Sequence, residues 1–268
     1  MNQAEKAQHS VQASATAKRD AANKNGDSQM NGLVERVIEA HGGQKRWRAF
    51  DKLTAQVVTG GFLWGLKGFE TDSAPRTMTA ELRRQAMRIE PFGNADWHLH
   101  YEPGRVLIET RGDETIVEQE NPRETFAGHT WETPWTPSQL GYFSAYAVWT
   151  YLNLPFLLGE PGFEVGEIPS INEEGISLKG LRVRFPEQIH THSTEQSLYF
   201  DESGLLRRHD YEVEIAGNNP ATHFVSDYVD VQGLKFPTKR RVFVRSDDGF
   251  AQLDRMPVSI DLFDFQLS

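Results

Sequence analysis

Two His-x-His pairs are the residues in this sequence whose spacing could support metal chemistry. They are His98 with His100 and His190 with His192. Successive side chains on a β-strand alternate between the two faces of a sheet, so each pair would point to one face. Two imidazoles that converge on a strand of a β-barrel can bind a transition metal.

Neither pair meets the further requirements of a metal site. The second pair weakly resembles the cupin motif, in which three or four residues separate the second His from a Glu, but here only two separate His192 from Glu195. On a regular strand Glu195 would also face away from both imidazoles. In the first pair the alternating residues of 97–101 are apolar, which turns His98 and His100 toward solvent. We therefore predict surface or loop histidines, with no bound metal or other cofactor.

Motifs for phosphate binding or for an activated nucleophile are absent from the sequence. There is no Gly-x-x-x-x-Gly-Lys-Ser/Thr, no Gly-x-Gly-x-x-Gly before a helix and no Gly-x-Ser-x-Gly. The glycine-rich stretch 60–68 lies between strand-like segments and predicts a bend in a curved sheet. The chain has no cysteine, which excludes thiolate catalysis, disulfides and Cys-ligated metal centres. No catalytic residue is predicted, and a non-enzymatic protein is favoured.

Three basic side chains fall on the predicted apolar face of long strands. Alternation along residues 205–215 places Arg207 and His209 inward, and alternation along 234–244 places Arg240 inward. A buried arginine is costly unless it is paired. It therefore needs an acidic partner, a position at the rim of the sheet, or the carboxylate or phosphate of an amphipathic ligand in an apolar pocket. The candidate acidic partners within the chain are Asp227, Glu195 and Asp264.

The segment 137–158 predicts a helix that is apolar on nearly all sides and is broken by Pro155. At about 3.6 residues per turn, one side carries Leu140, Phe143, Ala147 and Tyr151, and the other carries Tyr142, Tyr146 and Trp149. Such a helix must be buried on both sides or cover something apolar. Its aromatic residues therefore either belong to the core or line a ligand pocket. The candidate ligand contacts are Tyr142, Phe143, Tyr146, Trp149, Arg207, His209 and Arg240.

The remaining elements predict a mainly β fold. A helix over 33–40, stopped by His41-Gly42-Gly43, and a short helical piece over 44–50 come first. From Leu53 onward the hydrophobic period is two, and turn signals recur at hairpin intervals. Long strands are expected over 196–200, 205–215, 222–229, 234–244 and 258–265. An antiparallel meander of this kind suits a curved sheet or barrel better than a sandwich.

Composition limits the partners of the chain. Hydrophobic residues make up 38% of the 268 residues, enough for a sizeable core. A formal net charge of −10 disfavours nucleic acid and anionic membranes. No apolar run approaches the ~20 residues of a transmembrane helix. Residues 1–29 lack the apolar core of a signal peptide and are predicted to be a disordered tail before one domain over 30–268, in a cytoplasmic protein of undetermined oligomeric state.

Several short stretches resemble an uncharacterised family of bacterial proteins. They are Ala40–Gly43 followed by Trp47, Phe62–Gly68, Phe126–His129, Tyr142–Ser144, Pro155–Leu158 and Gly204–Tyr211. More distantly, the layout is similar to the lipoprotein-carrier superfamily of LolA and LolB. That resemblance implies an open antiparallel half-barrel of roughly ten strands, with helices covering a concave face that receives acyl chains. It implies no transferable site residues.

We therefore expect non-enzymatic binding or carriage of a lipid or another hydrophobic small molecule in a concave cavity. One alternative is an enzyme that acts on a hydrophobic substrate, with His209 and Arg207 as its polar centre. A closed pocket in which His209 faces an acidic partner would indicate it. The other alternative is a scaffold or interaction module without a ligand, indicated by an interior with no cavity of ~300 Å³.

Overall fold

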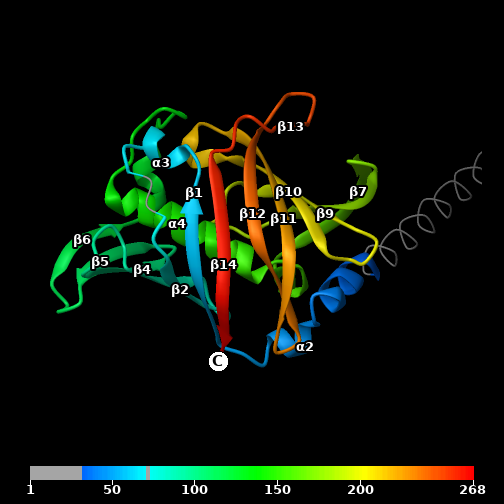
Figure 1. Ribbon diagram of the computed structural model, residues 1–268, viewed down its shortest axis with the longest axis horizontal. Coiled ribbons are helices and arrows are strands. Elements are labelled where there is room, and N and C mark those ends of the chain that lie inside the picture. Colours follow the sequence, from blue (N-terminus) through cyan, green and yellow to red (C-terminus); the bar gives the residue numbers. More distant parts are fainter. Residues whose placement is uncertain (1–31, 71–72) are drawn as a thin grey trace, which may run out of the picture.

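One antiparallel sheet organises the molecule (Figure 1). The computed structural model describes residues 32–70 and 73–268, so the tail expected over 1–29 lies outside the described residues. Within them the sheet has 14 strands. This exceeds the roughly ten strands implied by the resemblance. Residues 76–120 form five of these strands, each only five or six residues long.

The sheet consists of two meanders that meet at its centre. The first runs outward to one edge as β1 (Lys52–Gly60), β2 (Arg76–Glu81), β3 (Ala86–Glu90), β4 (Trp97–Glu102), β5 (Arg105–Thr110) and β6 (Thr115–Glu120). The second returns from the other edge as β7 (Glu164–Glu173), β8 (Ile176–Arg184), β9 (Glu195–Phe200), β10 (Leu206–Val213), β11 (Asn219–Val231), β12 (Leu234–Arg245) and β14 (Val258–Leu267). The two-residue β13 (Ala251–Gln252) pairs with β12 alone. Pairing of β1 with β14 joins the meanders.

The sheet is curved and open. Its two edges in the described residues are β6 and β7, which do not pair with each other. The ribbon curls around the helix of residues Pro137–Asn153, labelled α4 (Figure 1). The observed fold is thus the expected one, a mainly β antiparallel half-barrel with a covering helix.

Short helices complete the fold. The N-terminal helix covers residues 32–40 in its described part, and α2 (Gln44–Trp47) follows, as expected. Gly42 stops the first helix with φ 114°, and a Cβ there would lie 2.1 Å from the carbonyl oxygen of Gly233. The other helices are α3 (Leu63–Leu66) and the 3₁₀ turns η1 (Pro122–Phe126), η2 (Phe156–Gly159) and η3 (Glu214–Ala216). None of the helices in the described residues combines the length and the apolar character needed to cross a membrane.

The helix α4 connects the two edges of the sheet across the concave face. Thr136 caps its N-terminus in a capping box with Gln139, and Pro137 stands at its start. Pro155 follows its C-terminus, where the sequence predicted the break. Nearly all its side chains are buried. The apolar pattern on all sides therefore reflects a helix enclosed by the sheet.

The stretch 60–68 differs from the predicted bend. It forms the short helix α3 between β1 and β2. Leu63 and Trp64 are buried in the hydrophobic core, and the Trp64 indole donates to the carbonyl oxygen of Gly60. The glycines conceal this helix from a sequence pattern, because glycine is a poor helix former and favours turns.

A Gly141→Ala substitution tests the packing of α4 on the sheet. A Cβ on Gly141 would lie 2.1 Å from Cδ1 of Leu99 on β4, and Leu99 is fully buried. We expect a loss of about 1–3 kcal/mol in the free energy of unfolding, although alanine is the better helix former. Denaturant unfolding measures it. Gly65→Ala in α3, where a Cβ meets nothing within 4 Å, is the control and should be neutral or stabilising. Equal effects of the two substitutions would contradict close packing at Gly141.

Candidate functional site

An apolar crevice runs along one side of α4. Phe143, Ala147 and Val148 of the helix form one wall, and the inner faces of β12 and β14, through Val242 and Ile260, form another. The lining is almost entirely apolar, and the free volume is about 50 Å³. In this conformation the crevice is a narrow slot that admits little more than a few methylene groups.

Tryptophans close a further side of the crevice. Trp64 comes from α3, and Trp131 and Trp135 come from the loop before α4. The buried ammonium of Lys67 holds this loop by donating to the carbonyl oxygens of Trp131 and Thr133, and it lies 4.8 Å from the centroid of the Trp135 ring. Burial lowers the pKa of Lys67 to about 8. This wall therefore contains residues of Phe62–Gly68, one of the stretches that resemble the bacterial family.

A wider cleft adjoins the crevice. Thr59, Met78 and Ser144 line both spaces. The cleft has a volume of about 350 Å³ and also contains Glu70 and Arg76, and Arg76 Nη1 donates to Thr59 Oγ1 at 3.2 Å. An amphipathic molecule would find charged groups in the cleft and apolar groups in the crevice.

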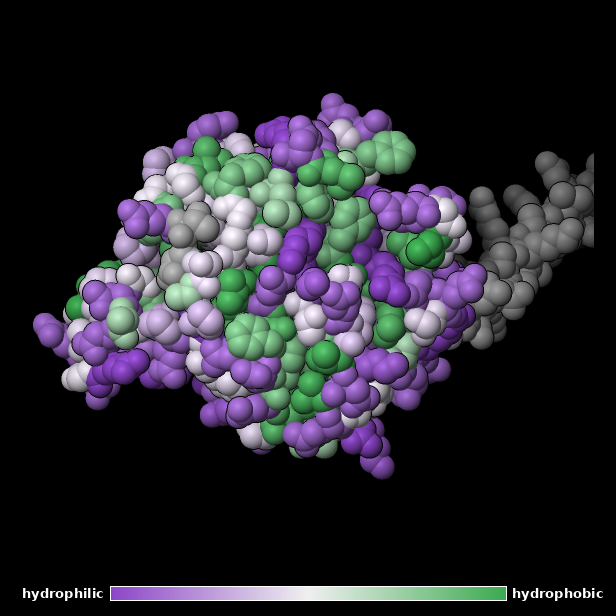
Figure 2. All heavy atoms as spheres, in the orientation of Figure 1, coloured by the Kyte–Doolittle hydropathy of each residue, from purple (hydrophilic) through white to green (hydrophobic). Residues whose placement is uncertain are grey.

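Apolar side chains also gather on the outside near the crevice. Figure 2 shows them on the upper rim, over α3 and around β13. Phe62, Phe250 and Leu253 are exposed there by 41%, 65% and 67%. Leu63, the neighbour of Phe62, lines the crevice. The exposed Phe62 therefore lies next to a wall of the crevice.

A network of tyrosines and histidines packs against α4, and two of its members, Tyr151 and His192, also line the crevice. Tyr142 Oη lies 2.9 Å from His190 Nδ1. His192 lies between two hydroxyls, with Nδ1 3.1 Å from Tyr146 Oη and Nε2 2.6 Å from Tyr151 Oη. A neutral imidazole can donate through one nitrogen and accept through the other, so an uncharged His192 can hydrogen-bond both hydroxyls.

Burial holds these histidines in the neutral state. Desolvation, with a smaller effect of the Arg123 guanidinium, lowers the pKa of His192 to about 3 and that of His190 to about 4. Desolvation likewise raises the pKa of Tyr146 and Tyr151 above the ordinary tyrosine value. The network is therefore a structural connection between α4 and the 186–194 loop, with no charged member among these four side chains at neutral pH.

A second buried polar cluster lies under Tyr151. Arg240 is 2% exposed, its Nη2 donates to the carbonyl oxygen of Tyr151 at 2.7 Å, and its guanidinium lies 5.0 Å from the Tyr151 ring centroid. His209 donates from Nε2 to Gln196 at 2.5 Å. Burial lowers the pKa of Arg240 to about 10.

Several polar atoms of this cluster have no hydrogen-bond partner in the described residues. They are Nε of Arg240, Nδ1 of His209 and both ring nitrogens of His223. His209 and His223 face each other across β10 and β11, with ring centroids 5.9 Å apart. An unsatisfied buried polar group costs about 1–3 kcal/mol. The cluster thus favours water or an anionic group as a partner, although it lies outside the lining of the crevice.

The structure does not bring all the candidate ligand contacts together. Phe143 lines the crevice. Tyr142, Tyr146 and Trp149 are sealed in the core, and the Trp149 indole donates to the carbonyl oxygen of Glu81 at 2.7 Å. Arg240 and His209 point inward, as the alternation predicted. Whether these residues contact a ligand stays a prediction.

The inward position expected for Arg207 is wrong. A β-bulge shifts the pairing of β10 with β9 between Leu206 and Arg208, which interrupts the alternation on which the prediction depended. The Arg207 side chain is 43% exposed and pairs with Asp201 at 2.6 Å. Asp201 was not among the expected partners. A bulge has no reliable signal in the hydrophobic pattern.

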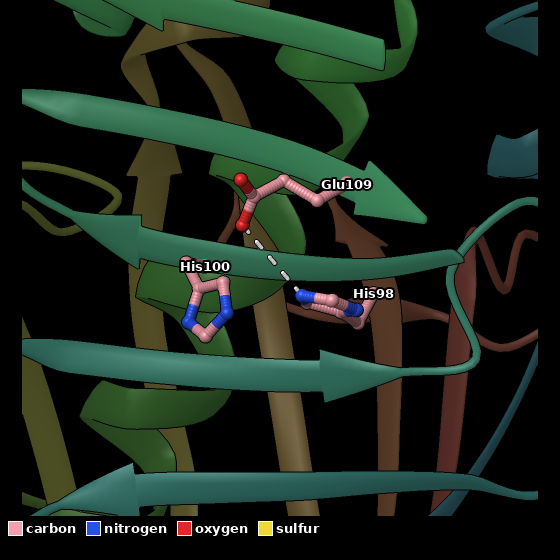
Figure 3. A group of neighbouring side chains, drawn as sticks. All are labelled: His98, His100 and Glu109. Atoms are coloured by element: carbon pink, nitrogen blue, oxygen red, sulfur yellow. Dashed lines mark ion pairs between the residues drawn. The ribbon is translucent and has the colours of Figure 1, made fainter. Parts of the chain in front are cut away.

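The two His-x-His pairs also differ from expectation. His190 and His192 lie in a loop, as one interpretation held, but His192 is buried. His98 and His100 lie on β4 and point to the face opposite α4, yet His98 is only 4% exposed. Glu109 of β5 lies beside them (Figure 3).

Ser144 and Thr59 line both spaces but were not among the candidate ligand contacts. Both are small polar side chains. An available signal was the position of Ser144 as a small residue among large ones on an apolar helix.

Acidification should destabilise the protein through His192. In the unfolded chain the pKa of His192 is about 6.5, so its imidazole is protonated below that pH. In the folded chain the pKa is about 3, so the buried imidazole stays neutral down to that pH. Unfolding therefore binds a proton between these values, and stability falls with decreasing pH by up to about 1.4 kcal/mol per unit for one such histidine. We expect His192→Asn to make the free energy of unfolding less dependent on pH between pH 6 and 4.5. The number of protons bound on unfolding should fall by up to one, and denaturant unfolding at several pH values measures it. An unchanged slope would contradict a neutral buried His192.

Comparison with solved structures identifies the fold. A LolA superfamily protein from Nitrosomonas europaea aligns at a TM-score of 0.50 with 8% identity, over 89% of this chain and 93% of that chain. A DUF1329 family protein from Desulfovibrio piger gives 0.49 with 10% identity, over 89% and 93%. An outer membrane lipoprotein-sorting protein domain from Vibrio parahaemolyticus gives 0.49 with 9% identity, over 90% and 93%.

The comparisons with sequences give no family. No protein-family model and no curated protein matches the chain. At 8% identity the Nitrosomonas europaea structure supports a likeness of fold alone, and the cytoplasmic location expected from the sequence gains no support from it. The chain has a LolA-like fold, as the distant resemblance in its sequence implied.

Proposed function

We propose that the protein binds or carries a hydrophobic or amphipathic small molecule along the open side of α4. The observation that carries the proposal is that the apolar crevice and the cleft share the lining residues Thr59, Met78 and Ser144. A chain-like apolar group would enter the crevice, and the rest of the ligand would occupy the cleft.

Apolar burial would supply the affinity. Removing ~300 Å² of apolar ligand surface from water yields about 7 kcal/mol at ~25 cal/mol per Å², and part of this offsets the cost of association. The cleft, at about 350 Å³, is near the lower end of the ~300–1,000 Å³ range of small-molecule sites. The crevice must widen to admit a chain, and of the three tryptophans in its wall Trp131 is the one that is partly exposed.

Of the two arginines expected to face inward and bind a polar group of the ligand, Arg240 alone faces inward. Arg240 lies behind Tyr151, so it reaches a ligand only when α4 shifts. The same requirement holds for four further side chains that are buried in the interior, namely Tyr142, Tyr146, Trp149 and His209. Among the described residues, Glu70 and Arg76 are the charged side chains that line the cleft.

The two alternatives receive less support. An enzyme centred on His209 and Arg207 would need the two side chains in one site. His209 is buried against Gln196, however, and Arg207 is exposed beside Asp201. A scaffold with a filled interior fits the packing around the tyrosine and histidine network. It does not explain an open cleft of about 350 Å³ next to an apolar crevice.

Ser144 offers a direct test because it is the half-buried residue of α4 that lines both spaces. A Ser144→Trp substitution should fill their junction and weaken binding of a fluorescent long-chain fatty acid by at least ~10-fold, equivalent to about 1.4 kcal/mol. Fluorescence titration measures the dissociation constant.

Ser144→Ala, which leaves the space open, is the matched control and should bind as the unsubstituted protein does. Thr59→Trp approaches the same junction from β1 and replaces Ser144→Trp if that variant does not fold. Equal binding by all three variants, or no binding of fatty acid, phospholipid or aliphatic alcohol by the unsubstituted protein, would refute the proposed site.

A further inference from the structure

Three side chains with metal-binding donor atoms converge on the outer face of the sheet, away from the cleft. His98 and His100 alternate along β4, and Glu109 stands directly opposite His98 on β5. The intervening Leu99 is fully buried on the inner face, close to Gly141 of α4. Figure 3 shows the two imidazoles and the carboxylate together on one side of the strands. The position of this group follows from strand register alone.

The distances leave a gap of the size of an ion. His98 Nε2 lies 3.7 Å from Glu109 Oε2, too far for a hydrogen bond. The His98 and His100 rings are perpendicular with centroids 4.9 Å apart. One donor atom from each of the three residues lies within 4.8 Å of the others.

His98 lacks the partners that a buried imidazole needs. The residue is 4% exposed, and its Nδ1 has no hydrogen-bond partner in the described residues. Its Nε2 makes only the long contact with Glu109. Burial of an imidazole without hydrogen bonds is costly. A ligand at Nε2 would remove part of that cost.

We propose that His98, His100 and Glu109 bind a divalent transition-metal ion of the zinc class. Tetrahedral zinc, with bonds of about 2.0–2.1 Å to nitrogen and oxygen, separates two ligand atoms by about 3.4 Å. A shift of a few tenths of an ångström in the Glu109 side chain achieves this from the observed 3.7 Å. Two imidazoles and one carboxylate favour Zn²⁺, Co²⁺, Ni²⁺ or Cu²⁺ over Mg²⁺ and Ca²⁺. Water would complete the coordination.

The positive charge of Arg88 lowers the affinity of the site for a metal ion. It stands opposite His100 on β3, and its Nη1 lies 2.8 Å from His100 Nε2. It also pairs with Glu90 at 2.8 Å, and its side chain is 40% exposed. The guanidinium can therefore turn away from His100 while keeping Glu90. Removal of Arg88 eliminates both the repulsion and the competing hydrogen bond, so it should tighten metal binding.

A bound ion would connect β4 to β5 close to the free edge of the sheet at β6. An ion that binds the folded chain alone stabilises it by RT ln(1 + [ion]/Kd). The site is independent of the crevice, so its occupancy and ligand binding in the cleft can be measured separately.

Titration of the metal-free full chain with Co²⁺, followed by displacement with Zn²⁺, tests the site. Visible absorption reports tetrahedral Co²⁺, and calorimetry gives stoichiometry and Kd for Zn²⁺. We expect one ion per chain and a higher melting temperature with Zn²⁺. Glu109→Gln and His98→Ala should each weaken binding by at least ~10-fold, and Arg88→Leu should strengthen it by a similar factor.

His129→Ala is the matched control, because it removes a half-buried histidine outside the group. It should leave the affinity unchanged. Glu109→Gln, which preserves shape, keeps the test decisive if His98→Ala does not fold. The proposal is overturned if neither the unsubstituted chain nor Arg88→Leu binds Zn²⁺, or if binding survives Glu109→Gln and His98→Ala unchanged.

Discussion

Enclosure of α4 by the concave face of the sheet is the constraint on which the rest of the structure depends. The helix lies between edge strands β6 and β7 in the sequence, and the connection between the two meanders crosses the interior of the half-barrel. Its apolar residues then replace a lipid-sized volume that an empty half-barrel would expose. Gly141 allows the close approach to β4 on one side. The space along Ser144 remains unfilled, and this remaining free volume is the candidate ligand site.

Polar chemistry in the interior has the same origin. A helix that carries three tyrosines into a closed interior must satisfy three hydroxyls. The chain does so with His190, His192, Tyr211 and the guanidinium of Arg123, and not with carboxylates. Because neutral imidazoles serve as both donor and acceptor, the interior holds α4 without an ion pair to these tyrosines. In the same interior, Arg240 and His223 have ring or guanidinium nitrogens without a hydrogen-bond partner in the described residues. This is the part of the interior where a water molecule or an anionic group would be most stabilising.

Much of this architecture was predictable from the sequence. The period of two marked the long C-terminal strands, and the apolar helix and its proline break marked α4, because these elements depend on burial pattern alone. Arg207 could not be placed, since one bulge reverses the faces of a strand. The burial of His192 depends on a loop folding under the helix, and the cleft depends on how α3 and β2 pack at Ser144. Long-range packing of this kind leaves no trace in local periodicity.

The most direct measurement is native mass spectrometry of the full chain purified from its own cells, followed by extraction and identification of bound small molecules. A hydrophobic ligand along α4 predicts a stoichiometric adduct that organic solvent releases as an amphipathic compound, and that Ser144→Trp lacks. Repeated recovery of the unsubstituted chain at its bare mass, with no amphiphile in the extract, would contradict the proposed carriage. The space beside α4 would then be a packing defect of a filled half-barrel.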